Sequence, residues 1–363
     1  MKQVHTADLK AGMVTAARVY TPMGQFLFEA GSVLTAQMIA HIAYYKISSV
    51  PIVDEVNEEE RLQKFLHQHP PLETRAQKIQ HSQEYQVFSQ KFNHNISTLH
   101  TALNDCILRS KELDTTELLT ETLDLFAAHT TTISMFDMLH NLRQIDDSTY
   151  AHSINVSIIS RMIGIWLNYS DEDLDLLTLC GMLHDIGKCC VSSQIISKPA
   201  KLTPEEYSEV QKHTLLGYEI LKPMELDEHV KNVALMHHER CDGTGYPQHL
   251  KDAEIDDFAA IVAIADVYDA MTANRCYRAG LCPFEVIAQF EQEGLQKYKP
   301  QYILTFLNRI ANTYINNTVR LNDGTVGEIV LINKRLTRPT IRTGPKEFIN
   351  LEERPDLYVQ AII

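Results

Sequence analysis

The spacing of apolar residues divides the chain into segments that predict different secondary structures. Over residues 1–56, short apolar runs alternate with glycine-containing turns, which is typical of short strands. Apolar residues between Leu34 and Tyr45 recur at helical spacing, and residues 50–53 predict a returning strand. We therefore expect a small N-terminal α+β domain over residues 1–56. Its role is expected to be accessory or regulatory, because it carries no catalytic constellation.

The next segment, residues 57–130, is expected to be a linker followed by connector helices. It begins with a charged stretch that a His-Pro-Pro sequence interrupts at 69–71. Apolar residues then recur at steps of three and four, which predicts a long helix; they are Phe88, Phe92, Ile96, Leu99, Leu103 and Ile107. Further helices are expected over 116–128 and 133–142. The apolar stripe fits a connector packed on the next domain, and it also fits the seam of a homodimer.

Residues 131–316 are expected to form one helical domain. From residue 149 to about 316 the spacing of apolar residues is helical almost throughout, and it changes after residue 316. Ser170, Thr203 and Asp256 each precede an acidic helix start, where a capping side chain is favoured. Over residues 317–363, an Asn-Asp-Gly turn between apolar runs predicts a β-hairpin with two further short strands. The expected fold class is mainly α: a helical domain, a small N-terminal α+β domain and a small C-terminal β appendage.

Composition and charge narrow the classes of function. With 44% apolar residues, the chain has enough material for a large core and two or three domains. The formal charge of −14 argues against a nucleic-acid polymer as partner, which would need a basic face. Seven cysteines without paired zinc spacing are typical of reduced thiols. No apolar run approaches the roughly 20 residues of a membrane helix, and the first residues lack a secretory pattern, so we expect a cytoplasmic protein without a membrane partner.

Side chains that bind metals recur inside apolar surroundings between residues 182 and 278. They are His184, Asp185, His213, His237, His238 and Asp266. An unpaired polar group in such surroundings costs several kcal/mol, so a shared metal site is the simplest explanation. Imidazole and carboxylate together, without an obvious thiolate, suit iron, manganese, nickel or zinc. Asp185 is the natural bridge, because adjacent residues at a helix end can address two ions, and two ions about 3.5–4 Å apart can activate water and polarise a phosphoryl oxygen.

At these residues the sequence resembles the HD-GYP branch of the HD metal-dependent phosphohydrolases, which hydrolyse cyclic di-GMP. The resemblance covers about residues 145–316. Its motifs are His152-Ser153 with Val156, His-Asp-Ile-Gly-Lys at 184–188, the run 198–203, His213, the His-His-Glu to Gly-Tyr-Pro run at 237–247, Asp266 with Asp269, and Arg275 with Tyr277-Arg278. A single His-Asp pair would be weak evidence for the family, because it occurs by chance in many chains. The ordered set of motifs at these spacings is very specific to it.

The resemblance implies roles for individual residues. The implied metal ligands are His152, His184, Asp185, His213, His237, His238 and Asp266, with Asp185 between two divalent ions. Iron or manganese is expected first, and nickel or zinc second. Asp185 and Lys188 would be catalytic, and Lys188, Asp269, Arg275 and Arg278 would face the substrate. Some members carry a glutamate where this chain has Ser148, and hold a third metal. Because serine is a poor ligand for divalent ions, we expect a dinuclear centre.

The expected function is hydrolysis of cyclic di-GMP to pGpG or GMP by a metal-bridging hydroxide, in bacterial second-messenger signalling. A phosphodiesterase for mixed cyclic GMP-AMP is an alternative in the same class. Two further alternatives are a receptor with a degraded metal site and a platform that docks diguanylate cyclase (GGDEF) domains through the Gly-Tyr-Pro loop.

Several residues also have simpler interpretations. Asp269 could cap its helix, orient Lys188 or face solvent, and the two arginines could be surface charges. Glu239 could be structural or a general acid. Cys189 and Cys190 are interpreted as buried small residues in preference to ligands.

Overall fold

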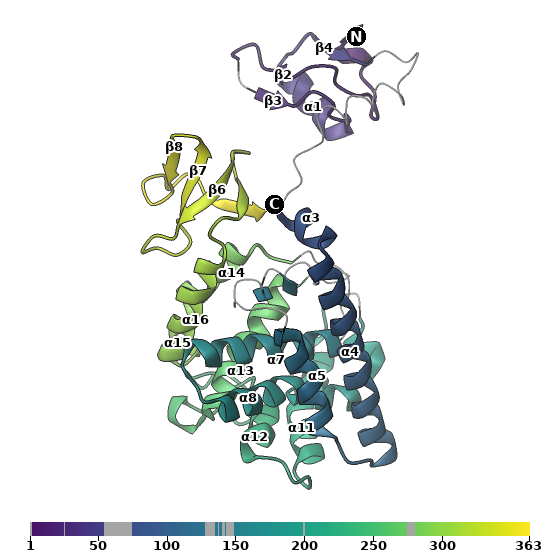
Figure 1. The fold of residues 1–363 in the computed structure, drawn as a ribbon, viewed down its shortest axis with the longest axis vertical. Helices are drawn as coiled ribbons and strands as arrows, with labels where there is room; N and C mark the ends of the chain where they lie inside the picture. Colours follow the sequence, from purple (N-terminus) through teal and green to yellow (C-terminus); the bar gives the residue numbers. More distant parts are fainter. Residues whose placement is uncertain are drawn as a thin grey trace. The chain divides into compact units, whose positions relative to one another are not determined.

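The computed structural model describes most of the chain, in two compact units, Met1–Glu73 and Thr74–Ile363 (Figure 1). The described residues are 2–24, 26–53, 75–127, 135–136, 138–139, 142, 149–198, 200–273 and 280–363, with the side chains of 75 and 76 left out. The linker expected from residue 58 to about 71 and parts of the helix expected over 133–142 lie outside them.

The N-terminal unit is a small α+β domain, as expected. Strand β1 (Lys2–His5) pairs with β4 (Ser49–Ile52), and β2 (Val19–Tyr20) pairs with β3 (Phe26–Phe28), both antiparallel. Helix α1 (Ala36–Tyr44) begins after Thr35, whose side chain accepts a hydrogen bond from the backbone of Met38. The buried core consists of Leu9, Val19, Leu34, Ile42, Val50 and Ile52.

The second unit is built mainly from helices, which confirms the predicted fold class. Among its described residues, the α-helices are α3 (Arg75–His81), α4 (Gln83–Arg109), α5 (Thr115–Ala127), α7 (Thr149–Trp166), α8 (Asp171–Leu183), α9 (Ser193–Ile196), α10 (Pro204–Gln211), α11 (His213–Leu221), α12 (Glu228–Met236), α13 (Asp257–Thr272), α14 (Pro283–Gln289), α15 (Leu295–Lys297) and α16 (Pro300–Thr313). Short turns of other helix types lie at η3 (Ile186–Cys190), η4 (Asp252–Glu254) and η5 (Phe290–Gly294). Ser170, Thr203 and Asp256 cap α8, α10 and α13, as the sequence predicted.

Helices α7, α8 and α13 form the centre of this unit. The residues of α13 are apolar on nearly all sides, and almost all are buried, which is expected of a core helix. Gly181 on α8 lies so close to α7 that an added Cβ would be 2.5 Å from Ser157 Cα. This close approach brings the C-terminal end of α8 against α7. Among the described helices, none has both the length and the apolar character that crossing a membrane requires.

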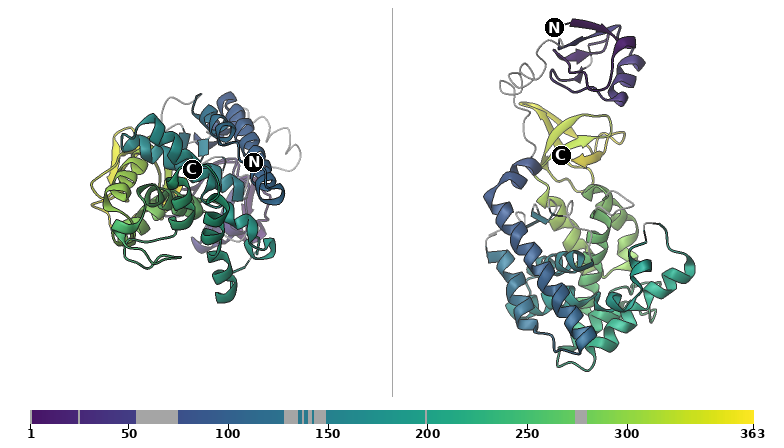
Figure 2. Two further views of the ribbon diagram at one scale, coloured as in Figure 1. Left: turned by 90° about the horizontal axis from the view of Figure 1, so that it is seen from below. Right: turned by 90° about the vertical axis from the view of Figure 1, so that its right-hand side faces the viewer.

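Helix α4 runs along the outside of the helical unit (Figure 2). Phe88, Phe92, Leu99 and Leu103 are buried in the same apolar cluster as the residues of α7 and α13. The structure therefore supports the connector interpretation of the stripe. A homodimer stays a prediction.

The C-terminal residues form a five-stranded antiparallel sheet. Its strands are β5 (Thr318–Leu321), β6 (Val326–Leu331), β7 (Thr340–Gly344), β8 (Glu347–Asn350) and β9 (Val359–Ile362), in the order β8-β7-β6-β5-β9. The hairpin at 318–331 and the next two strands match the prediction; β9 adds a strand that was not expected. Buried residues of the sheet, including Val319 and Ile329, join the apolar cluster of the helices. The predicted domain boundaries near 130 and 316 stay predictions.

Candidate metal centre

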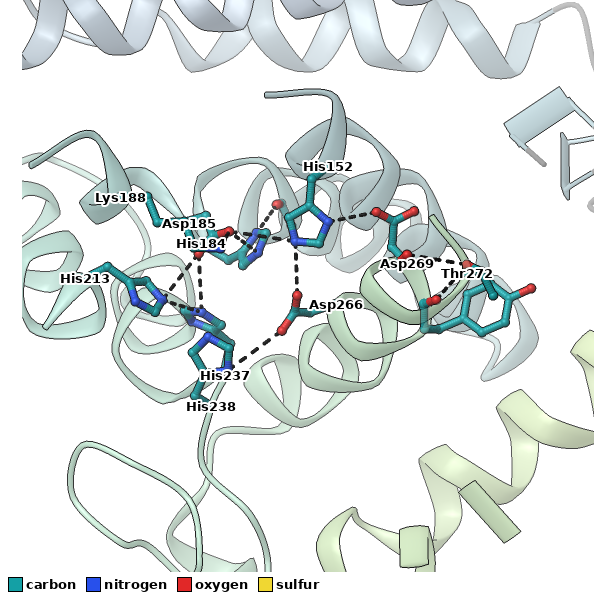
Figure 3. A network of polar contacts seen from close by, with 12 residues as sticks. His152, His184, Asp185, Lys188, His213, His237, His238, Asp266, Asp269 and Thr272 are labelled. Carbon is teal, nitrogen blue, oxygen red and sulfur yellow. Dashed lines mark hydrogen bonds and ion pairs between the residues drawn. The ribbon is translucent and has the colours of Figure 1, made fainter. Parts of the chain in front are cut away.

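Residues from five helices converge on one buried centre (Figure 3). His152 comes from α7, His184 and Asp185 follow the end of α8, His213 begins α11, His237 and His238 follow α12, and Asp266 lies on α13. Their donor atoms form three overlapping groups, each within 4.8 Å: His213, His237 and His238; His152, His184 and Asp266; His184, Asp185 and His237. The structure therefore brings together all seven of the residues expected to be ligands.

Hydrogen bonds fix the direction of three of the imidazole rings. Nδ1 of His184, His213 and His237 lies 2.7, 2.6 and 2.9 Å from a backbone carbonyl three or four residues earlier, so each Nδ1 carries the proton. Nε2 of each ring then keeps its lone pair, as in histidines that bind metals. The Nε2 atoms of His213 and His237 lie 3.2 Å apart. Two lone pairs facing each other at this distance repel unless a cation lies between them.

Asp185 lies at the middle of the centre and is 2% exposed. Its oxygens lie 3.3 Å from Nε2 of His184 and 3.3 Å from Nε2 of His213. Burial opposes ionisation of this carboxyl, but Lys188 and His184 outweigh it and hold the pKa well below its usual range. Within the described part of the chain, Asp185 Oδ1 and His184 Nε2 are buried without a hydrogen-bond partner. Buried atoms of this kind are costly, and a divalent cation would satisfy both.

The rings of His213, His237 and His238 are in the neutral form that can bind a cation. Burial lowers the pKa of His213, and burial together with neighbouring histidines lowers the pKa values of His237 and His238 well below the usual value. These rings are therefore unprotonated near neutral pH, the form that binds metals.

Asp269 has a neighbour that the sequence analysis did not anticipate. Its Oδ2 lies 2.8 Å from Nδ1 of His152, and Nε2 of the same ring lies 3.0 Å from Asp266 Oδ1. Burial disfavours the charged ring of His152, but the bonds to Asp266 and Asp269 outweigh it and raise the pKa to about 9. Asp269 is 1% exposed, so it does not face solvent. We propose that it positions His152, in place of the substrate contact expected from the sequence.

Replacing Asp269 by asparagine tests this role. The amide keeps the shape of the side chain but no longer offers a charged acceptor to Nδ1 of His152, so we expect metal affinity and activity to fall about 10- to 100-fold. Metal titration and far-UV circular dichroism of the full chain would measure the loss and check the fold. Asp124→Asn, at an exposed ion pair on α5, is the matched control. Unchanged metal affinity in Asp269→Asn would contradict the role.

Other sequence interpretations are refined by the structure. The two carboxylate oxygens of Glu239 accept hydrogen bonds from the backbone of Gln248 and Leu250, at 2.6 and 3.0 Å, which favours a structural role over a general acid. Cys190 is exposed and Cys189 half-buried, so the interpretation of both as buried was wrong. Arg275, Arg278 and Ser148 lie outside the described residues, and the predictions about them stand as predictions.

The fold and the centre define a mainly helical protein with a buried histidine–aspartate cluster that could hold metal ions. The family model for the HD domain matches residues 115–302, just over half of the chain. The chain belongs to the HD domain family, as the sequence motifs indicated.

Known proteins resemble parts of the chain. A cyclic di-GMP phosphodiesterase of Pseudomonas aeruginosa is 35% identical over 193 residues, which is 53% of this chain and 46% of that protein. The 3'3'-cGAMP-specific phosphodiesterase 3 of Vibrio cholerae is 37% identical over 144 residues, 40% of this chain and 31% of that protein. The matches thus span less than half the length of either relative. The solved structure of Bd1817, an HDG"Y"P protein from Bdellovibrio bacteriovorus, overlaps 85% of this chain and 99% of its own, with 17% identity and a TM-score of 0.46.

Proposed function

We propose that this protein hydrolyses the phosphodiester bond of cyclic di-GMP with the help of divalent metal ions. The observation that carries the proposal is the buried donor set around Asp185, with Lys188 beside it. Relatives that are named cyclic di-GMP phosphodiesterases support the choice of substrate. The expected product is pGpG, or GMP if a second bond is cut.

Two divalent ions, iron or manganese before nickel or zinc, would supply Lewis acidity and water activation at this centre. The chain's own residues determine where such ions bind. Asp185 offers its charge among three histidines: Nε2 of His184, His213 and His237 lies 3.3, 3.3 and 3.7 Å from its carboxylate oxygens. Since the backbone carbonyls fix these rings before an ion binds, little reorganisation is needed on binding.

Lys188 lies at the boundary between the buried centre and solvent. Its Nζ lies 2.5 Å from Asp185 Oδ2, and its side chain is 23% exposed, so the ammonium lies at the edge of the centre. This position lets it hold the Asp185 carboxylate in place and offer positive charge to a phosphate oxygen or a departing alkoxide. We also propose that Arg275 and Arg278 bind the phosphates or the guanines of the substrate.

Mixed cyclic GMP-AMP is the second candidate substrate, because one relative is named as specific for it. Both substrates share the 3′,5′ linkage that the centre would cut, and they differ in one base. A receptor with a degraded metal site is not favoured, since the seven donor residues are all present and convergent. Docking of diguanylate cyclase domains through the Gly-Tyr-Pro loop remains a separate proposal.

Turnover by anaerobically purified, metal-loaded protein tests the proposed function. We expect conversion of cyclic di-GMP to pGpG or GMP, seen by chromatography, and loss of turnover after chelation that returns when manganese or iron(II) is added. Mixed cyclic GMP-AMP serves as the competing substrate in the same assay. Binding of cyclic di-GMP without hydrolysis by fully metal-loaded protein would refute the proposal and favour the receptor.

A further inference from the structure

The ring of His238 lacks the hydrogen bond that fixes each of the other histidines in the centre. Three of those rings donate to backbone carbonyls, and His152 is bonded to Asp269. In the described part of the chain, the ring of His238 makes no hydrogen bond; its Nδ1 lies 3.8 Å from Asp266 Oδ2. Its side chain is 18% exposed, so the surrounding residues do not enclose it fully. A ring in such a position can rotate unless a further contact holds it. Another group must therefore set its orientation.

Tyr246, from the Gly-Tyr-Pro sequence, is placed to do this. Its ring stacks on the ring of His238, with 4.7 Å between centroids and 28° between planes. His213 and His237 cover other sides of the same imidazole, at 5.0 and 4.2 Å. Stacked aromatic rings attract each other beyond the effect of the area that they bury. The tyrosine thus covers one face of the imidazole and restricts rotation of the ring.

The loop that carries Tyr246 is itself tightly held. Both carboxylate oxygens of Glu239 accept backbone hydrogen bonds from the far side of the loop, at Gln248 and Leu250. The backbone N–H of Tyr246 donates to the carbonyl of His238 at 3.2 Å. At Gly245 an added Cβ would lie 2.3 Å from Arg240 N and 2.4 Å from Glu239 Cα, so the loop backbone lies directly on the chain that follows His238. The position of the tyrosine ring is therefore fixed relative to the imidazole.

We propose that Tyr246 is the positioning residue of His238, and that Glu239 and Gly245 fix the loop so that its ring can act. The stacked tyrosine fixes the plane of the His238 ring, and so the plane in which its lone pairs lie, whereas backbone carbonyls orient three of the other histidines by hydrogen bonds. The inference rests on the metal centre of the proposed function and is independent of which cyclic dinucleotide is cut.

The test compares Tyr246→Phe with Tyr246→Leu in the full chain, using cobalt(II) alone as the probe. Phenylalanine keeps the stacked ring, whereas leucine keeps apolar bulk without an aromatic face. We expect Tyr246→Phe to match the wild type in cobalt affinity, stoichiometry and visible absorption. Tyr246→Leu should bind cobalt about 10- to 100-fold more weakly and show changed absorption bands, because the ligand field at His238 changes. Tyr358→Ala, at a half-exposed tyrosine next to β9, is the control.

The outcomes separate the inference from the function on which it rests. Unchanged cobalt affinity and absorption in folded Tyr246→Leu would overturn the positioning role. Equal losses in both variants would also overturn it, because they would assign the effect to the hydroxyl group. If wild-type protein binds cobalt or manganese but cuts no cyclic dinucleotide, the proposed function fails. The cobalt data would then still decide the role of Tyr246.

Discussion

Asp185→Asn is expected to lose bound metal and phosphodiesterase activity together. The amide has nearly the same shape as the carboxylate, but it removes the negative charge that lies 3.3 Å from Nε2 of both His184 and His213. It also removes the ionic partner of Lys188. Charge stabilisation of several kcal/mol corresponds to a rate loss of about 1,000-fold or more. Elemental analysis and turnover measured on one preparation would show both losses.

The control for this variant is Asp175→Asn, which neutralises a carboxylate on α8 that pairs with Arg161 and is 38% exposed. It should keep its metal and its activity, because only the charge in the centre is expected to matter. Full activity in Asp185→Asn without bound metal would disprove the metal-dependent mechanism.

Gly187→Ala is expected to cause the largest disturbance of the fold around the centre. An added Cβ would lie 1.9 Å from the backbone oxygen of His213 and 2.5 Å from the backbone N of Gly217. These are backbone atoms of α11, so no side chain can move aside to make room. The helix must shift, and His213 with it. Overpacking of this kind costs about 1–3 kcal/mol or more.

Thermal unfolding and metal titration of Gly187→Ala would measure the two effects, and both melting temperature and metal affinity should fall. Gly294→Ala is the matched control, because the nearest atoms to an added Cβ there are side-chain carbons at 3.5 Å. It should leave both quantities close to those of the wild type. A Gly187→Ala protein with wild-type stability and metal affinity would show that α11 adapts without moving His213.

Local signals explain what the sequence predicted well. The caps at Ser170, Thr203 and Asp256 act within one turn, so the helix starts can be recognised without knowing the fold. A shared metal centre was predicted from six histidines and aspartates that are favourable in an apolar environment only if they meet, and His152 was added to the set by the family resemblance. That argument needs no packing detail, and the convergence of the seven residues agrees with it.

The features that escaped prediction depend on how distant elements pack. Asp269 lies 117 positions from His152, and only the packing of α13 against α7 brings the two side chains together. The sequence did hold a signal that Asp269 faces the metal centre: it lies three residues after Asp266, and residues three apart share one face of a helix. Strand β9 has four residues, too few for a clear alternating pattern, and it is defined by its pairing with β5.

The separation along the chain between the grouped donors has a consequence for folding. His152 and Asp266 lie 114 positions apart, so an ion held by both would close a long loop, as a disulfide cross-link does. A ligand that binds only the folded chain at 1,000 times its dissociation constant stabilises that state by about 4 kcal/mol. That is a large share of the stability of a typical domain. Metal supply in the cell would then control how much folded protein persists as well as how fast it turns over substrate, and starvation for the metal would favour degradation of the chain.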